Sequence, residues 1–350
     1  MNLLKYLLVA VATASLVGCA GSVRDVKVTK GESVVQYADQ VEIKYLGSGG
    51  HLIRRGNDVL MTAPFFSNPS MLEQLLPAKV KTDRIEAGLP DVSDVEMVLV
   101  GHSHYDHTMD LPYIAKKRAP KALFFGSATM KHLLAPAIER SRLIVMNDMA
   151  TSGQVPGEWV YSKNRAFRFM ALESDHAPHM LGMKLVSSAK LGEDLKTLPT
   201  FTRNYPEGEV FAYLIDFLNP DGKIAFRIYY QDTASSPGMG YIPDFDPVDQ
   251  APVDVAILCV GSFSQVKDYP EHILRMAKPK FVIAGHWEDF FRPQSDPIAV
   301  VPLASIDEFL RRARSVSQAG VKVPTPGTAL TYRVTNPDIT RATANTTTQQ

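Results

Sequence analysis

The stretch Gly101-His102-Ser103-His104-Tyr105-Asp106-His107 places three imidazoles and a carboxylate within six consecutive positions. The whole chain has only nine histidines among its 350 residues, so core packing does not explain this density. Imidazole and carboxylate groups together suit zinc or a similar divalent ion, and the absence of a nearby cysteine argues against a closed structural zinc site. The alternative is a surface loop that is rich in histidine. We favour a metal site, because His/Asp clusters of this kind are candidate ligands.

The residues on either side of this cluster predict where it lies in the fold. Met97-Val98-Leu99-Val100 is a short apolar run, which is typical of a strand buried on both faces in an α/β protein. Ligands in such folds bind at the carboxyl ends of the strands. We therefore expect His102 and His104 to leave a strand end with their side chains on the same side. A helix is expected to follow, from about Asp110 to Lys117.

The pattern His-x-His-x-Asp-His resembles the metal-binding motif of the metallo-β-lactamase superfamily. Three later segments match the rest of that family's ligand set, and each follows a strand-like apolar run. His176 stands where the family has its third histidine, Asp232 lies in a Gln-Asp-Thr that resembles the family's Gly-Asp-Thr, and His286 matches the last histidine. The resemblance covers roughly residues 40 to 335. It implies the family's fold, a four-layer αββα sandwich of two mixed β-sheets flanked by helices.

The resemblance also implies a centre of two metal ions with a shared aspartate. One ion would be bound by His102, His104 and His176, the other by Asp106, His107 and His286, and Asp232 would lie between them. Zn²⁺ is the expected metal, with Mn²⁺ and Fe as alternatives. Two such ions bind a hydroxide jointly because they lower the pKa of water from about 16 toward 7. Asp106 and Asp232 are the expected catalytic carboxylates. Iron-type members that reduce oxygen or nitric oxide usually carry a glutamate where this chain has His104, so hydrolysis is favoured over redox chemistry.

One position departs from the family pattern. Ala63-Pro64 stands where the family commonly has Asp-Pro, whose aspartate supports the ligands, and loss of such a partner changes metal affinity or activity by about 10–100-fold. Two further residues are candidates to support the ligands or to contact substrate. They are His179, three residues after His176, and Trp287, which follows the last histidine. The alternative for Trp287 is that it covers the sandwich as part of its packing.

Three other histidines and one long segment lie outside the ligand pattern. His51 opens a strand near the expected site and is a weaker candidate for a role there. His132 and His272 lie in helix-like segments, and we expect them at the surface. The segment 187–209 lacks clear periodicity, which is typical either of a lid or binding loop or of a plain surface excursion.

Strand-like runs alternate with helical segments along the chain, as the αββα sandwich requires. The predicted strands are 41–46, 51–54, 59–62, 97–100, 122–125, 143–146, 159–162, 167–172, 210–218, 223–230, 253–260 and 281–284. Asn219-Pro220-Asp221-Gly222 is a strong hairpin turn between two of them. Ser305 and Glu308 form a capping box that opens a helix running to about Ser317.

The N-terminal residues predict a lipid anchor. One lysine precedes a short apolar run that resembles a secretory signal, and Leu16-Val17-Gly18-Cys19 resembles a bacterial lipobox. The predicted divisions are a signal peptide (1–18), a tether that begins at the lipidated Cys19 (19–38), a hydrolase domain (39–335) and a polar tail (336–350). Ala20 favours sorting to the outer membrane of a bacterial cell envelope, facing the periplasm, where the lipid chains of Cys19 would anchor the protein. An ordinary signal peptide or a cytosolic start is the alternative.

Composition restricts the expected partners. The chain is 45% apolar and 21% charged, which is ordinary for a soluble globular protein, and its formal net charge is zero. Without a basic surplus we expect no nucleic acid as a partner. We expect a small-molecule or lipid substrate, and contact with a membrane through the lipid anchor. Cys259 lies inside an apolar run and is expected to be a buried free thiol.

The substrate class is the finest expectation that the sequence supports. The superfamily includes lactamases, thioesterases, lactonases, phosphodiesterases and nucleases, and a fold does not fix function. RNA-processing nucleases carry a large extra domain between the bridging aspartate and the final histidine, and too little chain separates Asp232 from His286 for that. Trp287 and the Pro-Phe-Phe-Ser of the opening hairpin resemble the branch of N-acyl-phosphatidylethanolamine phospholipase D and the ascorbate-phosphate lactonase-like hydrolases. We therefore expect hydrolysis of a phosphodiester or related ester. The alternatives are a lactonase, β-lactamase or thioesterase, or a non-catalytic envelope lipoprotein that retains the fold.

Overall fold

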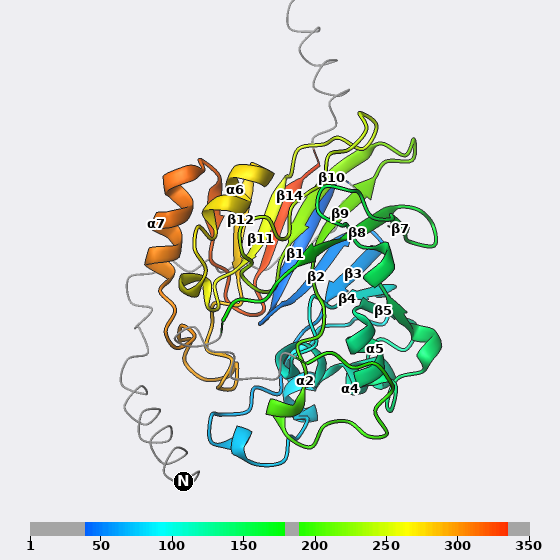
Figure 1. Cartoon of the computed structure of the whole chain (residues 1–350), viewed down its shortest axis with the longest axis vertical. Coiled ribbons are helices and arrows are strands. Elements are labelled where there is room, and N and C mark those ends of the chain that lie inside the picture. Colours follow the sequence, from blue (N-terminus) through cyan, green and yellow to red (C-terminus); the bar gives the residue numbers. More distant parts are fainter. Residues whose placement is uncertain (1–38, 179–188, 335–350) are drawn as a thin grey trace, which may run out of the picture.

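The computed structural model describes residues 39–178 and 189–334. Two β-sheets of seven strands each pack face to face, and helices cover their outer faces (Figure 1). This is the four-layer αββα sandwich that the sequence predicts. The predicted signal peptide (1–18), tether with Cys19 (19–38) and tail (336–350), together with His179, lie outside the described residues. No helix within the described part is long and apolar enough to cross a lipid bilayer.

The first sheet is antiparallel on one side and parallel on the other. In spatial order it consists of β14 (Ala329–Arg333), β1 (Gln40–Gly47), β2 (Gly50–Arg55), β3 (Asp58–Thr62), β4 (Met97–Leu99), β5 (Leu123–Gly126) and β6 (Leu143–Val145). The pairs from β14 to β3 are antiparallel, and the pairs from β3 to β6 are parallel. The central parallel strand β4 is buried along its whole length, which explains its continuous apolar sequence.

The second sheet repeats this mixed arrangement. In spatial order it consists of β13 (Gly320–Lys322), β12 (Phe281–Gly285), β11 (Val255–Cys259), β10 (Ile224–Tyr230), β9 (Val210–Leu218), β8 (Phe167–Ser174) and β7 (Val160–Tyr161). The pairs from β13 to β10 are parallel, and those from β10 to β7 are antiparallel. The predicted hairpin turn joins β9 to β10. Gly222 there adopts a left-handed φ of 81°, and its N–H donates to Asn219 O at 2.8 Å.

The helices divide between the two outer faces (Figure 1). The first sheet is flanked by α2 (Thr82–Gly88), α4 (Leu111–Lys117) and α5 (Ala128–Leu134), and the second by α6 (Glu271–Ala277) and α7 (Ile306–Val316). A single turn, α3 (Tyr105–Thr108), lies between β4 and α4. Short 3-10 helices are η3 (Glu73–Leu75), η4 (Arg140–Arg142), η5 (Asn147–Met149), η6 (Thr202–Asn204) and η7 (Phe263–Gln265). As predicted, the Ser305 hydroxyl caps α7 by accepting the N–H of Glu308 at 3.2 Å.

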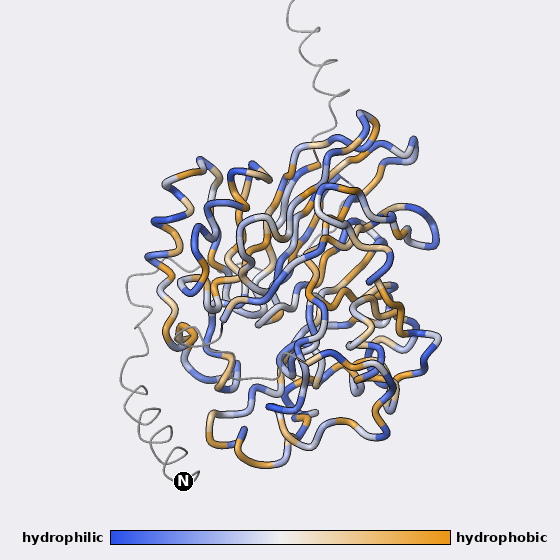
Figure 2. The backbone as a smooth tube through the Cα atoms, viewed as in Figure 1, coloured by the Kyte–Doolittle hydropathy of each residue, from blue (hydrophilic) through white to orange (hydrophobic). Residues whose placement is uncertain are grey.

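Three apolar clusters separate the four layers. The first lies between the first sheet and α2, α4 and α5, the second between the second sheet and α6 and α7, and the third between the two sheets. On α7 the buried residues Ile306, Phe309 and Ala313 recur at helical spacing, and hydrophobic and hydrophilic residues alternate around that helix (Figure 2). The inter-sheet cluster fixes the two sheets against each other, which brings their strand ends together at the site described below.

The predicted strands agree with the structure. Each of the twelve predicted strands corresponds to one observed strand, and their ends differ by at most two residues. The helix predicted from about Asp110 to Lys117 is confirmed as α4, whereas the helical turn α3 was not predicted. The sequence prediction missed β13 and β14, which are the edge strands added to the two sheets by the C-terminal part of the domain.

Candidate metal centre

Strand ends from both sheets meet at one end of the sandwich. β4 is followed by the segment 101–107, β8 by His176, β10 by Asp232 and β12 by His286. Neighbouring strands that run in one direction place their carboxyl ends at the same edge, so side chains far apart in sequence converge there. His176 is half-buried, and the other six candidate ligands are buried.

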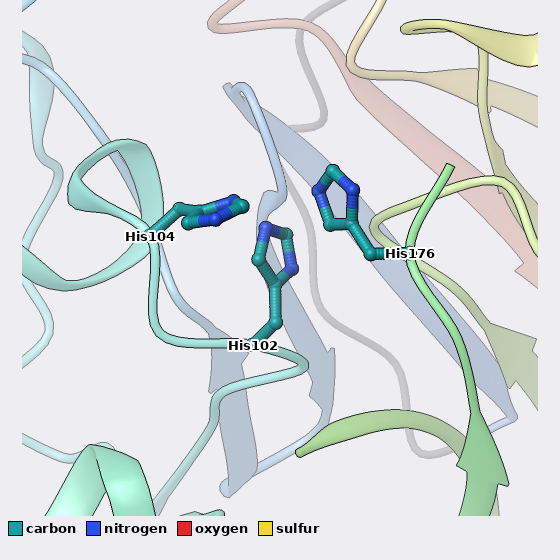
Figure 3. Close-up of side chains that lie close together, drawn as sticks. All are labelled: His102, His104 and His176. Carbon is teal, nitrogen blue, oxygen red and sulfur yellow. The ribbon is translucent and has the colours of Figure 1, made fainter. Parts of the chain in front are cut away.

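Three imidazoles form the first group. Figure 3 shows His102 and His104 leaving the chain after β4, while His176 approaches from the chain after β8, with the three rings turned toward one another. One ring nitrogen from each lies within 4.8 Å of those of the other two. The ring centroids are 4.8 Å apart for His102 and His104 and 4.5 Å apart for His102 and His176. This is a three-nitrogen site of the kind that divalent zinc accepts.

A second group lies beside the first. The ligand atoms of His102, Asp106 and His107 also lie within 4.8 Å of one another. Asp106 Oδ2 is 3.3 Å from His107 Nε2 and 3.1 Å from His286 Nε2. The carboxylate therefore lies between two imidazoles, one from each half of the chain.

Asp232 joins the two groups. Its Oδ1 lies 3.2 Å from His102 Nδ1, and its Oδ2 lies 3.5 Å from His107 Nδ1. The two oxygens of one carboxylate thus face one imidazole of each group. All seven side chains that the sequence singles out as candidate ligands are brought together by the fold.

The cluster fits divalent cations. Asp232 Oδ2 and His107 Nδ1 are buried and have no hydrogen-bond partner among the described residues. Buried polar atoms without hydrogen bonds are rare in folded proteins, and here they belong to groups that ligate metals. Gly101 leaves room for the shared carboxylate, because a Cβ at this position would lie 2.4 Å from both oxygens of Asp232.

The charges within the cluster are coupled. Burial raises the pKa of Asp106, but His107 and His286 outweigh it and hold that pKa well below its usual value. Burial likewise opposes the effect of His102 and His107 on Asp232, whose pKa is lowered overall. Burial lowers the pKa of His107, but Asp106 and Asp232 outweigh it and raise that pKa. For His102, burial and the neighbouring His107 give a lowered pKa. The two carboxylates are therefore ionised, and their negative charge favours the protonated form of His107, whose positive charge a divalent cation would replace.

This chain has the apolar residue Ala63 where the family commonly has an aspartate. Ala63 is fully buried, and its N–H donates to Leu99 O at 3.0 Å. Support for the neighbouring ligand comes through the main chain of Gly49, because a Cβ there would lie 2.7 Å from His107 Nδ1. The hydroxyls of Thr62 and Tyr230 both donate to Gly49 O, at 2.5 and 2.7 Å.

For Trp287 the packing alternative holds, and the expectation that His272 lies at the surface is wrong. Trp287 does not face substrate, because it is fully buried in the core under α6 and α7 and its indole N–H donates to Pro324 O at 2.7 Å. His272 is not at the surface. It is 3% exposed, and its Nε2 lies 2.8 Å from Ser235 O. Its helix α6 faces the second sheet, so the histidine falls on the inner side of that helix.

The remaining sequence candidates lie around the cluster. His51 is buried, with its ring 5.0 Å from that of Tyr45. Within the described residues, its hydrogen bonds and ring contacts reach none of the seven ligand side chains. His132 is partly exposed on α5 and pairs with Asp194 at 2.8 Å, away from the cluster. The described part of the segment 187–209, residues 189–209, is held to the body of the domain, for example by the Leu195 N–H donating to His132 O.

Sequence reasoning missed two buried residues beneath His286. Tyr45 and Glu288 are in contact through the phenol and the carboxylate, and the His286 N–H donates to the Tyr45 hydroxyl at 3.0 Å. A signal was present, since Glu288 is an acidic residue two positions after a candidate ligand and directly after a tryptophan. Its distant partner in β1 has no local signature.

Comparisons with known proteins find similarity to a metal-dependent hydrolase. No family model matches the chain. A UPF0173 metal-dependent hydrolase of Polynucleobacter asymbioticus is 24% identical over 260 residues, which cover 71% of this chain and 74% of that protein. Igni18, a metallo hydrolase of the archaeon Ignicoccus hospitalis, has a TM-score of 0.52 at 16% identity and covers 85% of this chain and 100% of its own. YhfI of Bacillus subtilis, a metallo-β-lactamase fold protein, has a TM-score of 0.47 at 13% identity, over 84% of this chain and 100% of its own.

The fold, the converging histidines and aspartates, and the similarity to a metal-dependent hydrolase agree. The chain has the αββα sandwich of the metallo-β-lactamase fold, and it is similar to a metal-dependent hydrolase.

Proposed function

We propose that this hydrolase uses two divalent ions, most simply Zn²⁺, to cleave a phosphodiester or a related ester. The observation that carries the proposal is the position of Asp232, whose two oxygens face His102 at 3.2 Å and His107 at 3.5 Å. A carboxylate between two groups of ligands is the arrangement that a pair of ions sharing one aspartate requires. A single-ion site would need only one of the two groups.

The seven side chains would serve as metal ligands, and one of them would also accept a proton. His102, His104 and His176 would hold one ion, and Asp106, His107 and His286 the other, with Asp232 shared. When bound, the ions lower the pKa of water and stabilise negative charge that develops on oxygen. Asp106 Oδ2 faces the two imidazoles, so we assign its Oδ1 as the acceptor for the proton that the attacking water releases. The low pKa of Asp106 keeps this carboxylate ionised at neutral pH.

Phe290 beside His286 and the exposed leucines on the turn around η3, together called the apolar rim here, would suit a substrate with a hydrocarbon part. The ring of Phe290 lies 4.9 Å from that of His286. Leu72, Leu75 and Leu76 are 78%, 67% and 59% exposed on the turn around η3. Gln74 of the same turn contacts Tyr105, the residue before Asp106. The lipid anchor expected at Cys19 would place such an enzyme beside phospholipid at the envelope, and that location is part of the proposal.

The test begins with the purified full chain. We expect about two equivalents of Zn²⁺ per chain and turnover of bis-p-nitrophenyl phosphate. His102→Ala and Asp232→Ala should abolish turnover while the chain still folds, and His132→Ala, a histidine variant away from the centre, should match the wild type. A lactone, a thioester and nitrocefin complete the substrate panel. Turnover of one of these instead would replace the phosphodiester assignment. A metal-replete protein that is silent on all four, and that captures one envelope partner consistently, would support the non-catalytic alternative.

A second experiment tests the apolar rim. Replacing Leu72, Leu75 and Leu76 together by serine should raise KM for a phosphodiester with a long acyl chain and leave bis-p-nitrophenyl phosphate unaffected. Val155→Ser with Val248→Ser is the matched control, because these valines are 64% and 82% exposed elsewhere on the surface. Equal kinetics for both variants on the long-chain substrate would remove the rim from the proposal.

A further inference from the structure

His286 holds an unusual backbone conformation at the candidate centre. It has a φ of 51°, in the left-handed region that residues other than glycine adopt only at an energetic cost. It follows β12 directly, so its conformation decides whether the imidazole turns toward Asp106. Such a conformation persists only where the surroundings enforce it. The contacts of its main chain therefore identify what positions this ligand.

The main-chain N–H of His286 is received by two groups from β1 and the turn after it. Tyr45 Oη lies 3.0 Å away and Ser48 O lies 3.1 Å away. Both acceptors belong to the first sheet's side of the sandwich, whereas His286 belongs to the second. The contact thus holds the end of β12 against the end of β1.

Glu288 is hydrogen-bonded to both residues that accept the His286 N–H, Tyr45 and Ser48. Its side chain is 3% exposed, its Oε1 accepts the N–H of Ser48 at 2.5 Å, and its Oε2 accepts the hydroxyl of Tyr45. Among the ion pairs of the described residues, none involves this carboxylate. A buried carboxylate without a cation destabilises the fold unless hydrogen bonds compensate for its lost hydration. The two donors supply that compensation, and in return the carboxylate fixes the phenol and the turn that receive His286.

The same turn supports the other imidazole of the second group. Gly49 follows Ser48, and a Cβ at Gly49 would lie 2.7 Å from His107 Nδ1, so the His107 ring rests on this main chain. Gln294 adds a further bond, from its Nε2 to Leu46 O at 2.8 Å. The residues 46–49 therefore hold the main chain of His286 and lie against the ring of His107. Within the described residues, no hydrogen bond of residues 46–49 reaches His104 or His176.

We propose that Glu288 and Tyr45 are positioning residues that set the second metal site, made of Asp106, His107 and His286, independently of the first. This inference rests on the two-ion function proposed above. Loss of either residue should weaken the binding of the second ion by about 10–100-fold, as for residues that orient ligands in other metal sites. The affinity for the first ion should not change.

The test measures metal affinity on the full chain, with activity as a separate readout. Tyr45→Phe and Glu288→Ala should keep one tightly bound Zn²⁺ per chain and lose the second at chelator concentrations that leave the wild type with two. Glu288→Gln should restore most of the second affinity, because its amide can still accept from Ser48 and contact the phenol. Tyr229→Phe is the matched control, since it removes another buried tyrosine hydroxyl bond, to Gly240 O at 2.8 Å.

The outcomes separate this inference from the function on which it rests. A wild-type chain that never binds a second ion would overturn the two-ion function. A wild-type chain with two ions, together with variants that bind both ions as tightly as wild type or lose both equally, would overturn the positioning role alone. If Glu288→Ala does not fold, Tyr45→Phe still decides the question, because it keeps the ring that fills the core. Unfolding temperatures of all variants are measured alongside.

Discussion

His286 Nε2 lies 3.1 Å from Asp106 Oδ2, although 180 residues separate the two positions in the chain. Asp106 follows a strand of the first sheet, and His286 follows a strand of the second. Their contact therefore exists only when the two sheets are packed against each other.

Asp106→Asn tests the role of this carboxylate. The amide keeps the shape of the side chain but removes its charge. The affinity for the second ion should therefore fall by more than about 100-fold, the upper end of the loss seen for residues that only orient a ligand. Metal content after dialysis and kcat are the measurements. Asp148→Asn, at an exposed aspartate on η5, is the control and should leave both unchanged. Wild-type zinc content in Asp106→Asn would contradict the assignment of Asp106 as a ligand.

Metal binding should release protons. The pKa of His107 is raised in the metal-free cluster because Asp106 and Asp232 outweigh burial, and an imidazole must lose its proton to ligate a metal. Protons and metal therefore compete, and metal affinity should decrease as the pH falls. Calorimetric titration with Zn²⁺ at one pH in two buffers of different ionisation heat measures the protons released. Identical heats in both buffers would mean that no proton leaves.

Asp110 should make stability depend on pH. Its carboxylate is fully buried and accepts from the N–H groups of Phe66 and Ser67 at 2.7 and 2.9 Å, and burial raises its pKa to about 6. Because this value lies above the unfolded one, the folded state binds the proton more tightly. The stabilisation is complete below about pH 4 and is lost as the pH rises through 6.

Asp110→Asn should remove this dependence. The shift corresponds to about 3 kcal/mol between the two ends of the range. Urea unfolding of metal-free protein at several pH values from 4 to 7 should show the stability of the wild type, measured relative to the variant, falling as the pH rises. Parallel pH curves for the two proteins would show that Asp110 titrates normally.

Gly101→Ala should disrupt the shared carboxylate. The added Cβ would lie 2.4 Å from both oxygens of Asp232, a distance at which one of the two must move. We expect loss of zinc and of turnover in a chain that retains its circular dichroism spectrum. Gly192→Ala is the control, because no atom lies within 4 Å of a Cβ there, and its stability should change by less than about 0.5 kcal/mol. A fully active Gly101→Ala enzyme would show that the carboxylate has more room than the structure indicates.

Asp216 should matter for stability alone. It is buried in the second sheet between Arg227, whose Nε donates to Oδ1 at 2.6 Å, and Arg168, whose Nε donates to Oδ2 at 3.1 Å. Asp216→Ala leaves two buried cations without their shared partner, which costs about 3–5 kcal/mol. Denaturant unfolding should show this loss, while zinc content per folded chain stays at the wild-type value. Reduced zinc in the folded variant would connect this cluster to the metal centre.

Local patterns predicted the strands and the first ligands well. His102 and His104 follow a strand whose apolar run is unmistakable, and their spacing of two residues places them together. The convergence with His176, Asp232 and His286 was a different kind of prediction. No local pattern says which strand ends become neighbours, so that part came from the resemblance to a family whose ligand order the chain repeats.

Other features depend on tertiary contacts that a single sequence does not contain. His272 has the spacing of a helix, but which side of α6 faces the sheet is decided by packing. Trp287 is adjacent to a ligand, yet the left-handed backbone of His286 precedes it and its ring lies in the core. The partnership of Glu288 with Tyr45 spans 243 positions, and neither residue alone predicts it.

Each candidate ion draws its ligands from both sheets. His102 and His104 depend on His176 to complete their group, as Asp106 and His107 depend on His286. A half of the chain that folded by itself would therefore hold neither ion firmly. Cations that bind only when the two sheets are packed together stabilise that packing by mass action. Zinc would therefore stabilise the fold as well as take part in the reaction. A cell that withholds zinc would then weaken the architecture of this protein together with its chemistry.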